Sequence, residues 1–149
     1  LAHAQPAQVA APPGAQPMTA YEVFTVFRNR TWLWGETGAS FFEPEGRRFK
    51  AWSSAEGDTI YAEGRWILTD TGRLCLQGDW HTAEGVVPAM SCFSHLRSGD
   101  SIYQMREPDG GWYVLTTLEP DQEEEGSEAL VAGDLVSAKL ETVKATTQQ

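Results

Sequence analysis

Residues 61–81, YAEGRWILTDTGRLCLQGDWH, decide the fold class of this chain. Two runs that alternate apolar and polar residues flank the turn Asp70-Thr71-Gly72, and glycine accepts the positive φ that a tight reversal needs. Turns of the same kind follow aromatic runs at Pro44-Glu45-Gly46 and Pro108-Asp109-Gly110. The pattern therefore predicts a series of antiparallel hairpins.

Pairing the two runs about the first of these turns sorts their side chains onto two faces, because successive residues of a strand point to opposite sides. One face is polar, and its cross-strand pairs are Tyr61 with His81, Glu63 with Asp79, and Arg65 with Gln77. The other face is apolar and is the predicted core: Trp66, Leu68, Leu74, Leu76 and Trp80.

The polar face has two interpretations. It is the solvated outside of a half-buried sheet, or, if the sheet is inverted so that this face lines a barrel, it is a polar ligand pocket. Two carboxylates that face each other beside an arginine and a histidine would perturb one another's ionisation. The candidate ligand-binding residues on this face are Tyr61, Glu63, Arg65, Asp79 and His81.

Eight strands are predicted along the chain, each bounded by a turn signal. They lie near residues 31–35, 39–43, 47–53, 59–69, 73–82, 87–96, 101–106 and 112–118. Their short connections favour an all-β, mainly antiparallel fold, either an eight-stranded meander or an up-and-down barrel. A two-layer sandwich is the alternative that the sequence leaves open.

A short helix is predicted before the strands, within residues 18–30. Thr19 is a plausible N-cap, and Glu22 three residues later completes a capping box. Apolar side chains recur at helical spacing and give one wide face: Tyr21, Val23, Phe24, Val26 and Phe27. We expect this helix to pack over the sheet or to plug one end of it.

The two ends of the chain differ in composition from the β region, residues 18–118, which we expect to form a single domain. Within residues 1–17, Ala2-His3-Ala4 matches the end of a secretory signal peptide, and an alanine- and proline-rich linker that we expect to be disordered follows it. Residues 119–149 begin with an acidic run and continue with a weak helical pattern. This tail is predicted to be a loosely docked helix or disordered.

Composition and charge narrow the classes of function that the protein could have. The chain has 149 residues, of which 41% are hydrophobic, and a formal net charge of −10 from 21 acidic and 11 basic side chains. Such a charge repels phosphate backbones and anionic lipid surfaces, so a nucleic-acid partner is not expected. No apolar run approaches the ~20 residues that span a bilayer, so no membrane span is predicted.

Cys75 and Cys92 are expected to form a disulfide. Folding the strand near 73–82 back on the strand near 87–96, about a turn centred between Ala83 and Glu84, places the two cysteines opposite each other, and cysteines of exported proteins usually pair. A zinc site that adds His81 and His95 is the rival interpretation. Strand geometry argues against zinc, because His95 is three residues from Cys92 and so faces the other side of the sheet, while His81 lies six residues, or ~20 Å, along the strand from Cys75. We predict no metal and no cofactor.

Tryptophan supplies a second group of candidate ligand-binding residues. The six tryptophans all fall in the predicted hairpins, and Trp32 and Trp34 share a face by alternation. Indole rings stack on sugars and small ligands as well as on core neighbours. These two rings are therefore either core aromatics or part of a ligand site.

No enzyme signature stands out. The chain has no G-x-S-x-G elbow, P-loop, H-E-x-x-H or dinucleotide-binding motif. Ser91 and Cys92 lie near His95 in sequence, but Cys92 is better explained as half of a disulfide. No catalytic residue is predicted.

The order of several motifs resembles a family of small exported bacterial proteins known only as a domain of unknown function. The motifs are TWLW at 31–34, FEPEGRRFKAW at 42–52, EGRW at 63–66, GRLC at 72–75, CFSH at 92–95 and PDGGWY at 108–113. The resemblance covers residues 18–115 and leaves the acidic tail after Pro120 outside. It implies an export signal, a small mostly antiparallel β domain and a paired cysteine couple, and it implies no activity.

We therefore expect a non-catalytic exported protein of the bacterial cell envelope or periplasm that binds a small molecule or glycan. The alternative is an accessory subunit or inhibitor that binds a larger envelope protein through its tails and an exposed sheet face. A hollow barrel with aromatic residues in its wall would favour ligand binding. A filled barrel with an exposed apolar patch would favour a protein partner.

Overall fold

A computed structural model describes residues 8–34, 37–55, 57–118 and 128–147. The described strands are β1 (Gln16–Pro17), β2 (Arg30–Leu33), β3 (Gly38–Phe42), β4 (Arg48–Ser53), β5 (Ile60–Leu68), β6 (Leu74–Thr82), β7 (Gly85–Ser98), β8 (Ser101–Arg106), β9 (Trp112–Leu118) and β10 (Glu128–Ala132). The described helices are α1 (Ala20–Phe27), the single 3₁₀ turn η1 (Glu45–Arg47) and α2 (Ser137–Thr147).

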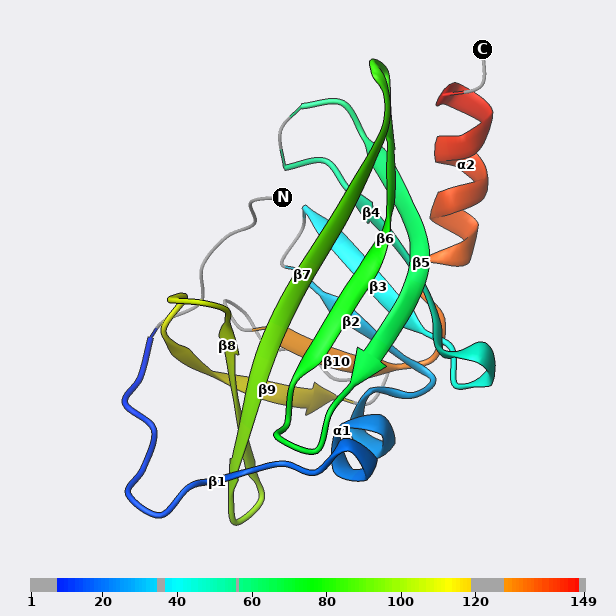
Figure 1. The fold of residues 1–149 in the computed structure, drawn as a ribbon. Helices are drawn as coiled ribbons and strands as arrows, with labels where there is room; N and C mark the ends of the chain where they lie inside the picture. The colour runs from blue at the N-terminus through cyan, green and yellow to red at the C-terminus, as the bar shows by residue number, and fades with distance from the viewer. Residues whose placement is uncertain (1–7, 35–36, 56, 119–127, 148–149) are drawn as a thin grey trace.

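Nine of the described strands close a barrel (Figure 1). The order is β7-β6-β5-β4-β3-β2-β10-β9-β8, and β8 pairs with β7 to complete the ring. Every neighbouring pair is antiparallel except β9 with β10, which is parallel. The short β1 adds to β7 outside the ring. The prediction of an all-β, mainly antiparallel barrel is confirmed.

The ninth strand of the ring, β10, corrects the predicted count of eight. The predicted strands correspond to β2–β9, whereas β10 and α2 come from the segment expected to be a loose tail. In β10, Ala129, Leu130 and Val131 are all buried, and a short apolar run buried on both faces has no periodicity that separates strand from helix. The acidic run at 119–127 lies outside the described residues.

Helix α1 covers the lower end of the barrel in Figure 1. Its capping box is formed as predicted: the Thr19 hydroxyl accepts from the Glu22 amide, and the Glu22 carboxylate accepts from the Thr19 amide. Val23 and Phe27 are fully buried. Tyr21 was expected on this apolar face and is instead 76% exposed. The buried stripe of the helix is narrower than predicted, because it runs through Val23 and Phe27, which are four residues apart.

Helix α2 lies against the outside of the barrel, over β4 and β5 (Figure 1). It starts after Asp134, whose carboxylate accepts from the Val136 and Ser137 amides. Its contact with the wall is a second apolar cluster: Ala39, Phe41, Tyr61, Val136, Leu140 and Val143. This cover explains why both faces of β3 are buried.

The segment predicted to be a linker follows the barrel wall from residue 8 onward. The Val9 amide donates to the Trp112 carbonyl at 2.9 Å, and Gln16 pairs with Arg97 of β7. The Ala2-His3-Ala4 motif lies outside the described residues. Within the described parts of the chain, no helix is long and apolar enough to cross a membrane.

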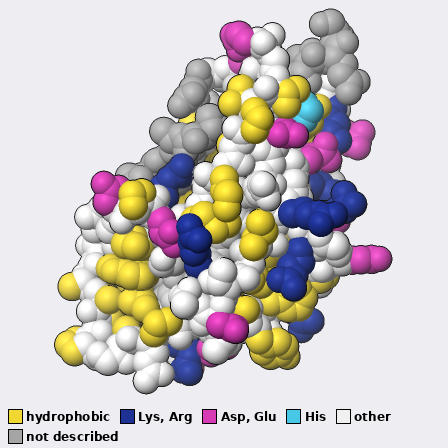
Figure 2. All heavy atoms as spheres, viewed as in Figure 1, with side chains coloured by type: hydrophobic (Ala, Val, Ile, Leu, Met, Phe, Trp, Pro, Cys, Tyr) yellow, Lys and Arg dark blue, Asp and Glu magenta, His cyan; other side chains and the backbone are white. Residues whose placement is uncertain are grey.

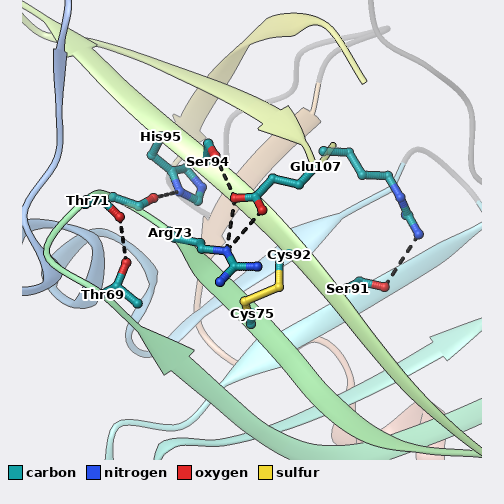
Figure 3. The surroundings of a disulfide bond; sticks show 11 residues. Thr69, Thr71, Arg73, Cys75, Ser91, Cys92, Ser94, His95 and Glu107 are labelled. Atoms are coloured by element: carbon teal, nitrogen blue, oxygen red, sulfur yellow. Dashed lines mark hydrogen bonds and ion pairs between the residues drawn. A yellow bond between two sulfur atoms is a disulfide. The ribbon is translucent and has the colours of Figure 1, made fainter. Parts of the chain in front are cut away.

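The disulfide is present between Cys75 of β6 and Cys92 of β7 (Figure 3). The two cysteines are register partners, and the hairpin turns between Thr82 and Gly85, as predicted. Because both sulfurs are bonded to each other, neither is a thiolate that could bind zinc, and the rival zinc interpretation is wrong for these residues.

Candidate functional site

A cavity lies inside the barrel, in the half away from α1. It is lined by aromatic, small and polar side chains from six strands: Trp32, Trp34, Ser40, Phe49, Ala51, Leu76, Gly78, Trp80, Ala89, Ser91, Phe93 and Arg106. The centres of water-sized molecules can occupy about 40 Å³ of it. Since one water needs roughly 10–15 Å³ by this measure, the barrel is not completely filled by its own side chains.

The aromatic wall follows from strand alternation in β2 and through Trp34, the residue directly after it. Trp32 and Trp34 point inward on the same face, with ring centroids 5.8 Å apart in an edge-to-face arrangement. Trp32 also meets Phe93 of β7 at 4.9 Å, and Trp34 meets Trp80 of β6 at 6.4 Å. These contacts fix the rings as one continuous surface around the cavity.

Glycines keep the strands around the cavity close together. A Cβ on Gly78 would lie 2.6 Å from the Glu63 carbonyl oxygen and 2.9 Å from Cζ of Phe49. Gly64, its register partner on β5, would place a Cβ 2.0 Å from the Gln77 carbonyl oxygen. At Gly38 a Cβ would lie 2.3 Å from Cε3 of Trp34, so the indole occupies the space that a side chain would take.

Two polar groups in this wall stand out. Arg106, the last residue of β8, is half-buried and places its guanidinium carbon 5.7 Å from the centroid of the Phe93 ring. Its Nη2 lies 3.5 Å from the Ser91 hydroxyl oxygen, and no carboxylate of the described residues pairs with it. Ser40 is fully buried, and its hydroxyl has no hydrogen-bond partner among the described residues.

The lower half of the barrel holds a different polar arrangement that is fully bonded. His95 Nδ1 lies 2.8 Å from the Gly72 carbonyl oxygen, and Nε2 lies 2.9 Å from Nε2 of Gln104. The Tyr113 hydroxyl donates to Oε1 of Gln104. Burial lowers the pKa of His95 to about 4, although the Gly72 hydrogen bond and the charge of Glu107 act in the opposite direction. These hydrogen bonds link His95 of β7, Gln104 of β8 and Tyr113 of β9 beneath the cavity, and the imidazole is neutral.

The network around the disulfide joins Glu107 to Arg73 and Ser94 (Figure 3). Glu107, the residue after Arg106, accepts from Nε of Arg73 at 3.0 Å and from the Ser94 hydroxyl at 2.8 Å. Its amide donates to the Cys92 carbonyl at 2.9 Å. Because successive strand residues point to opposite faces, holding Glu107 on the outside keeps the side chain of Arg106 on the inside.

The polar residues predicted from the sequence lie on the outer surface of the barrel wall. The predicted register is confirmed: Tyr61 pairs with His81, Glu63 with Asp79, and Arg65 with Gln77. The apolar face is the interior, where Trp66 and Leu74 are buried. The wall therefore separates this set from Trp32 and Trp34, and the inverted-sheet interpretation is wrong.

On the outer surface the predicted residues fall into two groups. Glu63, Arg65 and Asp79 line a shallow open groove together with Gln77 and the Pro88 to Met90 segment of β7. Tyr61 and His81 stack with parallel rings 4.4 Å apart, and α2 covers Tyr61. Glu63 also forms an ion pair with Lys144 of α2 at 3.1 Å.

Sequence reasoning missed Arg106 and Ser40. Both lie within predicted strands, but their inward direction depends on the pairing of β8 with β7 and of β3 with β4. Strand parity was the signal that could have found Arg106. Arg106 opposes Phe93, which lies one residue from Cys92, so the arginine lies on the same face of the sheet as an aromatic residue.

The sequence profile of a family described as a protein of unknown function, DUF995, matches residues 1–136. The chain belongs to the DUF995 family. No curated protein and no solved structure gives a significant match to the chain. The DUF995 match continues past residue 115 through β10, so the resemblance predicted from the motifs was too short. The family description assigns no activity, and a functional proposal for this DUF995 protein depends on the cavity itself.

Proposed function

We propose that this protein is a non-catalytic binding protein that holds a small molecule in the barrel cavity. The observation that supports it best is the combination of an aromatic wall with two polar groups: Ser40, whose buried hydroxyl has no hydrogen-bond partner among the described residues, and Arg106, which has no carboxylate partner among them. Small-molecule sites are mostly apolar concave surfaces with a few polar groups that orient the ligand. The cavity has this composition.

A compact ligand fits the geometry better than an extended glycan. Sugar chains stack on rings that are open to solvent in a groove, whereas Trp32 is fully buried and Trp34 is 7% exposed. The space inside is small, so a ligand larger than a few atoms requires side chains of the wall to move. We therefore favour a small molecule with a short apolar body.

We also propose that the protein acts in the cell envelope or periplasm. The Cys75–Cys92 disulfide supports an oxidising compartment, because such bonds are rare where thiols are kept reduced. Fractionation of the native cell tests this: the protein should appear in the periplasmic or secreted fraction with both cysteines protected from alkylation. A cytoplasmic protein with free thiols would contradict it.

The binding proposal is tested by filling the cavity. Ala89 lines the cavity from β7, so Ala89→Phe should abolish binding of a small aromatic probe, benzyl alcohol, measured by tryptophan fluorescence and calorimetry. Met90→Phe is the matched control, because the neighbouring side chain lies on the outer surface and is 57% exposed. Equal binding by both variants would contradict a site in the cavity.

A protein partner is the second candidate function, and an exposed apolar patch favours it. The β6–β7 hairpin projects beyond the barrel (Figure 1), and Figure 2 shows hydrophobic side chains gathered over its upper part. Val86 is 56% exposed and Val87 is 53% exposed. A photo-crosslinking residue at Val87 should then capture one protein in the envelope, whereas the same residue at Thr71, at the other end of the barrel, should not.

A further inference from the structure

We infer that the cavity binds a small monocarboxylic acid with an apolar body, and that Arg106 holds its carboxylate. This inference depends on the proposed function and specifies its ligand. It follows from the surroundings of Arg106, from the hydroxyl of Ser40, and from the chemistry of the remaining wall.

Arg106 is a charged group in an aromatic cavity without a counter-ion from the described residues. Its contacts are the Phe93 ring at 5.7 Å and a long hydrogen bond of 3.5 Å to Ser91. Charge-assisted hydrogen bonds are normally near 2.7–2.9 Å, so this contact leaves most of the five guanidinium donors unused. The guanidinium is half-buried, and a ligand carboxylate would supply a charged partner for its free donors in a bidentate geometry.

The carboxylate next to Arg106 in the chain does not turn toward the cavity. Glu107 is bound on the outer surface by Arg73 and Ser94. Three other ion pairs between described residues also lie outside the cavity lining: Lys50 with Glu43, Arg97 with Glu22, and Lys144 with Glu63. The cavity therefore carries a positive charge although the whole chain has a formal charge of −10.

Ser40 gives the second, independent observation. It lies on β3, which is on the opposite side of the ring from β8 in the strand order, and its hydroxyl is fully buried without a partner. A buried hydroxyl without a hydrogen bond is costly. A ligand that extends from Arg106 across the cavity would bring a polar atom to this hydroxyl.

The rest of the wall selects an organic acid over an inorganic anion. Trp32, Trp34, Phe49 and Trp80 surround the polar groups with apolar surface, which favours a ligand body that buries carbon. Phosphate would bring more charge into this wall than one arginine neutralises. A single carboxylate on a short aromatic or aliphatic body matches both the charge and the surface.

Calorimetry with two probes of similar shape tests the inference. Benzoate should bind the wild-type protein roughly 10- to 100-fold more tightly than benzyl alcohol, the range expected for hydrogen bonds to a charged group. Arg106→Gln should remove that preference while benzyl alcohol still binds, and Arg106→Lys should restore part of it. Arg48→Gln, at an exposed arginine at the start of β4, should leave the preference unchanged.

The outcomes separate this inference from the proposed function. Equal affinity for both probes in the wild type would overturn the acid ligand and leave the cavity as a binding site. No binding of either probe would overturn both. If Arg106→Gln does not fold, the wild type alone decides: added chloride should weaken benzoate and leave benzyl alcohol unchanged, and inorganic phosphate should not compete. An equal response of the two probes to chloride would contradict the role of Arg106.

Discussion

At the scale of single residues, two basic side chains that face the barrel interior, the buried His95 and the half-buried Arg106, have different surroundings. His95 is bonded at both ring nitrogens and stays neutral, whereas Arg106 lines a cavity with no carboxylate partner among the described residues. The first arrangement stabilises the lower half of the barrel. The second leaves the guanidinium of Arg106 available to a ligand in the upper half.

The burial of His95 predicts a loss of stability in mild acid. Its pKa is about 4 in the folded protein, below the ordinary value of 6.5, so below pH 6.5 the unfolded chain binds a proton that the folded chain does not. The free energy of unfolding should fall between pH 6.5 and pH 4, by about 3 kcal/mol in total from this residue. Urea titrations across this range measure it.

The control for the pH prediction is a comparison of two histidine variants. His95→Gln should lower stability at pH 7.5 but flatten the pH dependence between 6.5 and 4, because the titrating group is gone. His81→Gln, on the outer surface, should keep the wild-type slope. Parallel curves for the wild type and His95→Gln would contradict the burial of a neutral imidazole.

At the scale of elements, the disulfide stabilises the β6–β7 hairpin that forms one side of the cavity. Replacing both cysteines, Cys75→Ala with Cys92→Ala, should lower the free energy of unfolding by roughly 3 kcal/mol, because the bond closes a loop with a sequence separation of 17. Urea denaturation of the oxidised and double-variant proteins measures the difference. A change below the error of the titration would contradict a stabilising role.

Loss of the apolar contact between helix α2 and the barrel wall is expected to detach α2 without opening the barrel. Leu140 is buried against the outer wall, so Leu140→Asp should remove that contact and place a charge in an apolar cluster. Hydrogen exchange should rise in α2 while the strands that face the cavity, such as β6, stay protected. Glu141→Ala, on the exposed side, is the control. A uniform rise across the barrel would show that α2 is part of the core.

Local sequence patterns predict most of these elements and miss one for a physical reason. Turn glycines such as Gly72 fix the hairpins, and parity then places Cys75 opposite Cys92. The strand β10 forms no hairpin, since it pairs in parallel with β9, the strand before it, and antiparallel with the distant β2. Its three buried residues also show no period. The inward direction of Arg106 likewise depends on a pairing between strands that local patterns do not specify.

At the scale of the whole molecule, β10 makes the barrel a closed ring, so the domain does not end at Leu118 as the sequence predicted. β10 pairs with β2 on one side and β9 on the other, and its removal would leave two sheet edges open. A chain that ends at Leu118 should lose the near-ultraviolet circular dichroism of packed tryptophans. A chain that ends at Gly133 should retain it. A folded shorter chain would contradict this closure.

The most direct test of a ligand site inside the barrel is a crystal structure of the oxidised protein with benzoate. We expect density for the probe among Trp32, Trp34 and Trp80, with its carboxylate within hydrogen-bond distance of the Arg106 guanidinium. A cavity that contains only water, with benzoate elsewhere or not bound, would contradict it.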